Sequence, residues 1–304
     1  MEMEDAAMVK PAWQIALPGF MLVFAACSEA SAAYVDDRFF PSTLATVVPT
    51  PADFLNFPHF VTLPETAGTR EYDFLFTYSK LITNDWSVFF TETFRTLDGA
   101  NGSTVSGFEN LVLGTQYQLY TNPEHQFVFT VGGTASLGGT GSSDVAPSYS
   151  TLTPTIYVGK GLGDLPDSVS WLQPINLTAN LGVALPTEKT TAAGATIPDV
   201  LNWSFAVEYT MLKDNYTSTG HRYPTGWVPL VEVALTTPLD GPDAGFTTGT
   251  INPGVIWVGK QFQFGLEGIV PINSRSGEGL GVRAQIHFYL GNIFPNSIGK
   301  PIFD

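Results

Sequence analysis

Large apolar side chains alternate with small polar ones along much of this sequence, which limits the folds open to it. Between residues 202 and 212, Trp203 and Phe205 occupy one parity, while Ser204 and Glu208 occupy the other. The same alternation recurs in three further segments, at residues 175–185, 261–270 and 282–290. A period of two indicates a β-strand, because successive side chains point to opposite faces of a sheet. The chain is therefore expected to be all-β.

The length of these segments and the nature of their polar side distinguish a soluble sandwich from a membrane barrel. They run for roughly ten to thirteen residues, whereas soluble strands cluster near five or six and a tilted membrane-spanning strand needs about 9 to 11. Their polar side is mostly Gly, Ala, Ser, Thr, Asn and Gln, and only 13% of the whole chain is charged. An open sheet edge would leave amides unpaired in a bilayer. The sequence thus predicts a closed antiparallel transmembrane β-barrel.

Twelve strands account for the barrel, which spans residues 57–290. We place them at residues 57–64, 71–80, 86–97, 108–120, 126–138, 150–160, 171–185, 200–212, 227–237, 250–259, 261–270 and 280–290. The first strand is required if both ends of the barrel are periplasmic, although prolines flank it. The tail, residues 291–304, is expected to be periplasmic.

Long and short connections alternate along these strands. The long ones are rich in Gly, Ser, Thr or Pro and are expected to be extracellular, at residues 98–107, 139–149, 186–199, 238–249 and 271–279. The short ones are expected to be periplasmic, as in membrane barrels of this kind. Residues 213–226 are an exception, because this periplasmic connection is long.

The amino terminus has the pattern of a signal peptide, at residues 1–33. An apolar stretch at 15–27 is followed by small residues, and it is too short for a membrane-spanning helix. The first seven residues are acidic, so a translation start at Met8 would suit a signal peptide better. Cys27 is the only cysteine, and lipoprotein cleavage before it is the alternative.

Residues 34–56 precede the first strand and include three prolines among apolar side chains. Barrels of eight strands are filled by side chains and those of sixteen or more hold a channel, so twelve strands predict a narrow pore. This segment is expected either to enter the lumen and restrict it, or to extend into the periplasm.

Three short stretches resemble a known family. Residues 108–125 (FENLVLGTQYQLYTNPEH), Gly138–Gly141 and residues 294–303 (FPNSIGKPIF) are similar to bacterial outer-membrane proteins of the MetA-pathway phenol-degradation family. The resemblance implies an outer-membrane barrel that passes small organic or aromatic compounds, and it brings no catalytic residues. One departure is the end of the chain, where Asp304 follows the aromatic Phe303.

Charged residues within the predicted strands fall mostly on the polar parity. The candidate lumen or constriction residues are Arg95, Glu208, Glu232, Glu267, Arg283 and His287. They could form a charged constriction that selects polar solutes, or internal ion pairs that fill a plugged barrel. Glu92 lies on the apolar parity, which predicts a register shift or bulge beside it.

The sequence gives no support for catalysis or for a cofactor. No G-x-S-x-G motif occurs, the four histidines lack metal-ligand spacing, and residues 254–260 imitate a phosphate loop without its Ser or Thr. A formal charge of −15 disfavours nucleic acid.

The expected function is passive uptake of small, hydrophobic or aromatic organic solutes across the bacterial outer membrane. The lipids of that membrane and these solutes are the expected partners, and the oligomeric state is left open. The alternative is a non-transporting barrel with a structural or partner-binding role.

Overall fold

A computed structural model describes residues 33–35, 37–191, 194–216 and 222–303 of the chain. The predicted signal peptide lies outside these residues except for Ala33, and so does Cys27. None of the described helices is long and apolar enough to cross a membrane.

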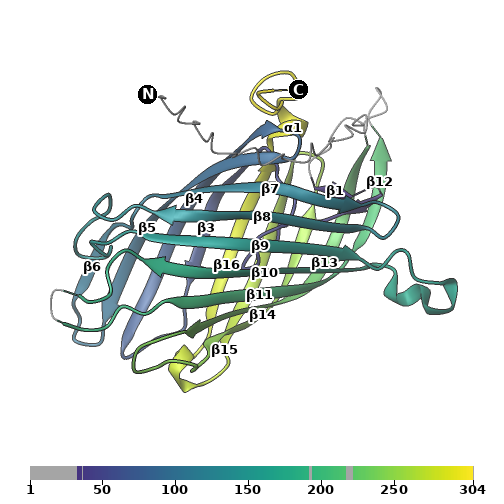
Figure 1. Ribbon diagram of the computed structural model, residues 1–304. Coiled ribbons are helices and arrows are strands. Elements are labelled where there is room, and N and C mark those ends of the chain that lie inside the picture. The colour runs from purple at the N-terminus through teal and green to yellow at the C-terminus, as the bar shows by residue number, and fades with distance from the viewer. Residues whose placement is uncertain (1–32, 36, 192–193, 217–221, 304) are drawn as a thin grey trace, which may run out of the picture. The chain divides into compact units, whose positions relative to one another are not determined.

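The described chain forms a closed antiparallel barrel of twelve strands (Figure 1), which confirms the predicted fold class. In chain order the strands are β3 (Phe54–Thr62), β4 (Thr69–Thr83), β5 (Trp86–Gly99), β7 (Val112–Asn122), β8 (Phe127–Ser136), β9 (Thr151–Gly161), β10 (Ile175–Pro186), β11 (Val200–Tyr209), β13 (Arg222–Pro238), β14 (Thr248–Val258), β15 (Phe262–Pro271) and β16 (Gly281–Tyr289). Pairing of β16 with β3 closes the ring.

Two strands of the barrel are interrupted, so that two further segments extend its hairpins. β6 (Thr104–Phe108) pairs with the end of β5, and β12 (Met211–Tyr216) pairs with the start of β13. The predicted connections 98–107 and 213–226 therefore contain strand. Most of their side chains are polar, and some bond to the neighbouring strand, as Ser106 does to Thr96 of β5 at 2.9 Å, so no sustained apolar alternation marks them as strand.

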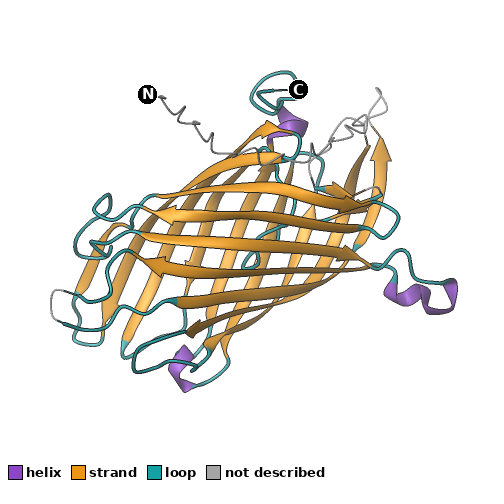
Figure 2. Cartoon of the chain, viewed as in Figure 1, coloured by secondary structure: helices purple, strands orange, loops and turns teal. Residues whose placement is uncertain are grey.

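Several predicted strand boundaries were wrong. The first strand begins at Phe54, and Pro58 lies inside it where the register with β4 shifts, a position that tolerates a residue without an amide proton. The seventh begins at Ile175, because residues Asp167–Leu172 form a short helix, η1. The barrel ends at Tyr289, where helix α1 (Leu290–Ile293) starts. These helices and η2 (Ser274–Ser276) lie outside the wall (Figure 2).

The two ends of the barrel differ in their connections. The end that carries residues 137–150, 187–199, 239–247 and 272–280 is called the long-loop end, and the opposite one the short-turn end. β1 (Tyr34–Val35) and β2 (Arg38–Phe39) form a separate small hairpin. The tail runs back to β4, where the Phe303 amide donates to the Ile82 carbonyl at 2.8 Å.

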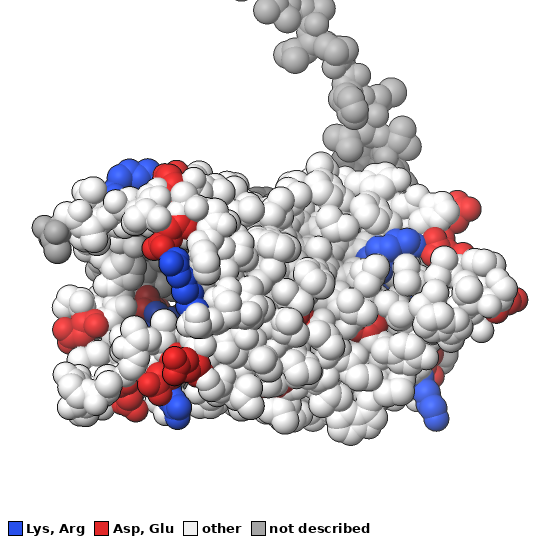
Figure 3. Space-filling view, turned by 90° about the horizontal axis from the view of Figure 1, so that it is seen from below, with Lys and Arg blue, Asp and Glu red and all other residues white. Residues whose placement is uncertain are grey.

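The outer wall is apolar. Eleven barrel strands carry a large exposed apolar side chain, namely Phe60, Phe74, Phe90, Leu113, Ile156, Leu181, Phe205, Val231, Ile251, Leu266 and Val282. Most charged side chains gather toward the two ends, with an uncharged band between them (Figure 3). This is the surface that a barrel presents to lipid.

Glu92 interrupts this apolar wall. It shares the outer parity of β5 with the exposed Phe90 and Phe94, and it lies opposite Phe76 on β4. The pairing of β4 with β5 is regular around Glu92. On the other side of β5 the register shifts by one residue, between Thr91, which pairs with Val112, and Phe94, which pairs with Phe108. The register shift predicted beside Glu92 is therefore confirmed, and the Glu92 carboxylate keeps the outer parity of its strand, on the lipid side.

On the inner face, glycine makes room for an aromatic ring. Gly114 on β7 pairs with Phe89 on β5, and a Cβ built on Gly114 would lie 2.1 Å from the Phe89 ring. The ring therefore covers the space that a side chain at residue 114 would need.

Replacing Gly114 with valine is expected to lower the free energy of unfolding by about 1–3 kcal/mol, because Phe89 must move. Denaturant unfolding in lipid vesicles would measure this. Gly268→Val is the matched control, since a Cβ at Gly268 meets no atom within 4 Å. An equal loss in both variants would contradict the packing argument.

Replacing Glu92 with leucine is expected to raise the free energy of unfolding in a bilayer by about 1–2 kcal/mol, because a carboxylate on the lipid face is unfavourable. The same vesicle assay applies. A loss of stability would mean that Glu92 has a stabilising partner within the membrane.

Candidate functional site

The chain between the β1–β2 hairpin and β3 lies against the inward side chains of the barrel. Strand side chains bond to its backbone: the Asn176 amide donates to the Phe39 carbonyl at 2.8 Å, and Gln116 donates to the Val48 carbonyl at 3.1 Å. Thr130 donates to the Pro49 carbonyl. These partners come from β10, β7 and β8, so the segment is held by distant parts of the wall. We call residues 39–53 the inner segment.

Side chains on β13, β15 and β16 hold the middle of the inner segment. The Glu232 carboxylate accepts from three consecutive backbone amides, those of Leu44 at 2.7 Å, Ala45 at 2.9 Å and Thr46 at 2.5 Å. The Ser42 amide donates to Gln263 Oε1 at 3.1 Å, and the Ser42 carbonyl accepts from Gln263 and Gln285.

Apolar contacts fill the space between these polar ones. Leu44 and Phe39 pack in one cluster with inward side chains of the wall, which are Val228, Leu230, Ile256, Val258 and Tyr289. Phe40 and Val48 pack with Val128 in a second cluster. Strands whose inward positions are apolar carry apolar side chains on both faces, as in the run from Trp227 to Val231.

Together these contacts bury inward side chains between the middle of the barrel and its short-turn end, and we call this zone the buried level. Eleven barrel strands carry an inward side chain that is at most 3% exposed there, namely Ser79, Ser87, Gln116, Thr130, Tyr157, Thr178, Glu208, Glu232, Ile256, Gln263 and Gln285. An open water-filled pore would leave these side chains accessible.

The hairpin before the inner segment is tied to the short-turn end. Arg38 on β2 donates to Gln126 at 3.0 Å, to Thr210 at 3.2 Å and to the Gln173 carbonyl at 2.6 Å. At the other end of the inner segment, Asp53 accepts from Lys80 Nζ at 2.6 Å and from the Leu81 amide at 2.8 Å. Both ends of the segment are thus anchored on the barrel.

A separate charged cluster lies toward the long-loop end. Arg95 on β5 contacts Glu71 at 2.8 Å, Asp73 at 2.8 Å and Glu109 at 2.7 Å. Its guanidinium bonds both oxygens of Asp73, a paired geometry that fixes the orientation of the side chain. Three carboxylates around one guanidinium leave this part of the wall negatively charged.

The other candidate residues occupy different places on the inner face. Glu267 and Arg283 form a 2.6 Å ion pair between β15 and β16. Glu208, which is fully buried, accepts from Thr178 at 3.2 Å. His287 Nδ1 lies 2.6 Å from Asn56 Oδ1, and its ring stacks on Phe54.

The structure therefore divides the six candidates instead of gathering them into one ring. Glu232 holds the inner segment, Arg95 belongs to the cluster near the long loops, and His287 lies beside the start of β3. Coulombic interaction links Glu267 with both Glu232 and Arg283.

Sequence reasoning missed the partners of these residues. Asp73 has the inward parity of its strand, which could have marked it as a partner for Arg95 on the next strand. Gln263 and Gln285 also have the polar parity, but no sequence signal indicates that their partner is the backbone of Ser42. In the described part of the chain, no three His, Cys, Asp or Glu side chains are placed to hold a metal ion.

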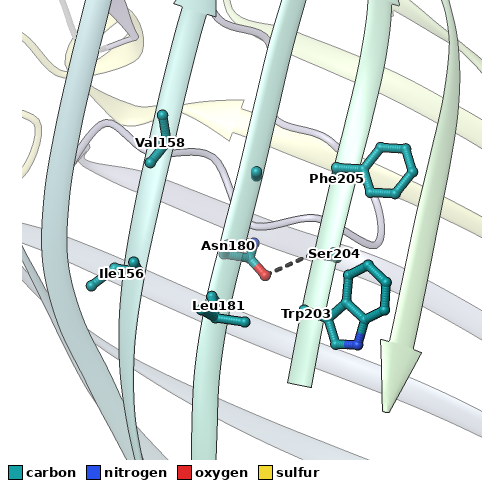
Figure 4. A pocket seen from close by; sticks show the side chains of 8 residues that line it. Ile156, Val158, Asn180, Leu181, Trp203, Ser204 and Phe205 are labelled. Carbon is teal, nitrogen blue, oxygen red and sulfur yellow. Dashed lines mark hydrogen bonds between the residues drawn. The ribbon is translucent and has the colours of Figure 1, made fainter. Parts of the chain in front are cut away.

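The outer wall contains a depression of about 230 Å³ (Figure 4). Ile156, Leu181, Trp203 and Phe205 on three adjacent strands surround it, and beneath it Ser204 donates to Asn180 at 2.6 Å. The surrounding apolar side chains have the outer parity. The depression therefore faces lipid and is no part of the inner site.

Arg95→Ala is expected to lower the free energy of unfolding by about 2–3 kcal/mol, because three half-buried carboxylates lose their shared partner. Arg275→Ala is the control, since the ion pair of Arg275 with Asp243 is solvent-exposed and contributes at most about 1 kcal/mol. Denaturant unfolding in vesicles would compare the two, and equal effects would contradict a special role of the cluster.

The sequence matches no family model and no curated protein. Among solved structures, the chain is similar to the COG4313 outer membrane channel from Pseudomonas putida F1, with a TM-score of 0.53 and 10% identity over 83% of this chain and 99% of that one. The KdgM and NanC porins show TM-scores of 0.46 and 0.47, each at 10% identity, over 77% and 78% of this chain and 98% of each porin. The shared barrel fold and the apolar outer wall confirm the predicted location in an outer membrane.

Proposed function

We propose that the protein is an outer-membrane channel for small organic solutes, which is closed by the inner segment, residues 39–53, and opens when this segment moves. The observation that carries this proposal is the level at which inward side chains of eleven strands are at most 3% exposed. The inner segment buries these side chains. Because it pairs with no barrel strand, it can move out of the lumen without breaking the hydrogen bonds between strands.

The wall is shaped to accept this segment. A Cβ on Gly159 would lie 2.7 Å from Pro49 and 3.1 Å from Phe40, and a Cβ on Gly265 would lie 2.8 Å from Leu44. A barrel that served only as a scaffold could fill this space with strand side chains, as barrels of eight strands do. Small inward residues instead leave a lumen that the inner segment occupies.

The lining that the segment covers is mixed in character. Movement of residues 39–48 would uncover an apolar stripe, made by Val228, Leu230, Ile256 and Val258. Next to it lie the amides of Gln263 and Gln285. An apolar stripe beside hydrogen-bonding groups suits small hydrophobic or aromatic solutes that carry a polar group. The resemblance of residues 108–125 to the phenol-degradation family points to the same solute class.

A non-transporting barrel is the second candidate, because the same buried level would also suit a permanently sealed structure. In that case the inner segment would be part of a fixed core. The two candidate functions predict different conductance after the inner segment is removed: a channel would conduct ions, and a structural barrel would not.

Deletion of residues 34–52 is expected to give discrete single-channel openings in planar bilayers, while the complete chain stays closed or nearly so. The deletion ends at residue 52 so that Asp53 keeps its contact with Lys80. Phenolic solutes are expected to block the openings in part, because they bind the uncovered stripe.

The control for this experiment is the folded state of the deletion protein, measured by its gel mobility before and after heating. A silent protein that is correctly folded would contradict the channel and favour the structural candidate. Openings in the complete chain equal to those of the deletion would contradict closure by the segment.

A further inference from the structure

We propose that Glu232 is the latch of the inner segment, and that the channel opens when this carboxylate loses its charge or its reach. The inference rests on the proposed function and names the contact that regulates it. Of the side chains that hold residues 39–50, in the part of the chain that the structure describes, Glu232 alone carries a charge.

The geometry at Glu232 is that of an anion-binding loop. Three successive amides, from Leu44 to Thr46, converge on the two carboxylate oxygens at 2.5–2.9 Å. Successive backbone amides in a tight loop form a concave site for an anion. Hydrogen bonds to a charged acceptor are about twice as strong as those between neutral groups. The barrel thus supplies the anion, and the inner segment supplies the site.

The contact of Glu232 with the inner segment differs from the other contacts in the number of backbone amides that it satisfies. The Gln and Asn side chains that hold the segment are neutral, and each bonds one or two backbone groups. Glu232 satisfies three amides at the bend between Ser42 and Val47, where no strand or helix provides partners. Without the carboxylate, these three amides would be buried unpaired, which favours a conformation in which water can reach them.

The surroundings of Glu232 also favour release once its contacts weaken. Asn252 lies directly opposite on β14, fully buried, with neither side-chain atom bonded. Glu267 on β15 is a further buried carboxyl group of the inner face, and Arg283 contacts only one of its oxygens. The local charge is balanced in part by the amides of the inner segment, so their bond to Glu232 decides whether the closed arrangement is favourable.

The test is Glu232→Gln in the complete chain, recorded in planar bilayers. Glutamine keeps the size of the side chain but replaces one acceptor oxygen with a donor NH2 group. We expect about a tenfold rise in open probability, since a charge-assisted contact is replaced by a neutral one. Glu65→Gln, at an exposed ion pair with Arg70 outside the inner site, is the control for charge removal and is expected to leave the channel closed.

A double-cysteine lock shows whether the inner segment is what moves. A Cβ on Gly265 would lie 3.1 Å from Leu44 Cγ, so Leu44→Cys and Gly265→Cys place two thiols for a disulfide. In the Glu232→Gln background, with Cys27→Ser, oxidation is expected to close the channel and reduction to reopen it. Openings that persist in the oxidised protein would overturn the proposal.

The outcomes separate the latch from the channel itself. If the protein lacking residues 34–52 conducts while Glu232→Gln stays closed, the latch is wrong and the channel stands. If the deletion is silent and folded, both are wrong. Should glutamine at 232 prevent folding, Glu232→Asp tests the same contact by shortening its reach while keeping the charge. A folded but closed aspartate variant, with no gain in labelling of Leu44→Cys by a thiol reagent, would also overturn the latch.

Discussion

Backbone amides in a hydrocarbon layer must find partners inside the protein, and this requirement shapes the whole barrel. Each strand pairs on both sides, and β16 returns to β3 so that no edge is left. Interruptions occur only where other groups take over. Between β6 and β7, for example, the Glu109 amide donates to the Thr93 carbonyl at 2.8 Å, and the Leu111 amide donates to Thr140.

The same requirement applies inside the barrel, where it is met in another way. Residues 40–52 have no strand partner, yet most of them are buried. Their carbonyls and amides are satisfied by strand side chains, among them Asn176, Gln263 and Glu232. The polar parity of the strands therefore serves as a set of hydrogen-bonding partners for a second backbone, which explains its wealth of amides and hydroxyls and its scarcity of lysine.

The acidic side chains of the inner face occupy two different places along the barrel. The acidic groups near Arg95 lie toward the long loops, whereas Glu232 lies within the buried level. Solutes entering from the long-loop end would meet the acidic wall before they reach the inner segment. Glu92 is the departure from this pattern, since the regular pairing of β4 and β5 places it on the lipid side.

Much of the barrel follows from local pattern. Alternation of apolar and polar residues indicates which face of a sheet each side chain points to. The twelve strands and the inward parity of Glu208, Glu232 and Glu267 could therefore be predicted from the sequence alone. Hairpin extensions such as Thr104–Phe108 could not, because such a short segment, with Gly, Ser and Thr at three of its five positions, shows no sustained alternation. The start of the seventh strand was missed because Trp171 looks like a strand-end aromatic and lies instead in η1.

What the sequence by itself determined is the set of strands, their facing and the membrane as their surroundings, since each depends on neighbours one or two residues apart. Only the tertiary structure decided which residues meet. Arg95 contacts two carboxylates on β4 and a third between β6 and β7, and Glu232 contacts the amides of Leu44, Ala45 and Thr46, 186 to 188 positions away. Backbone amides are common to all residues except proline, so their partners leave no trace in a sequence. Their convergence on one carboxylate appears only when the barrel has closed around the inner segment.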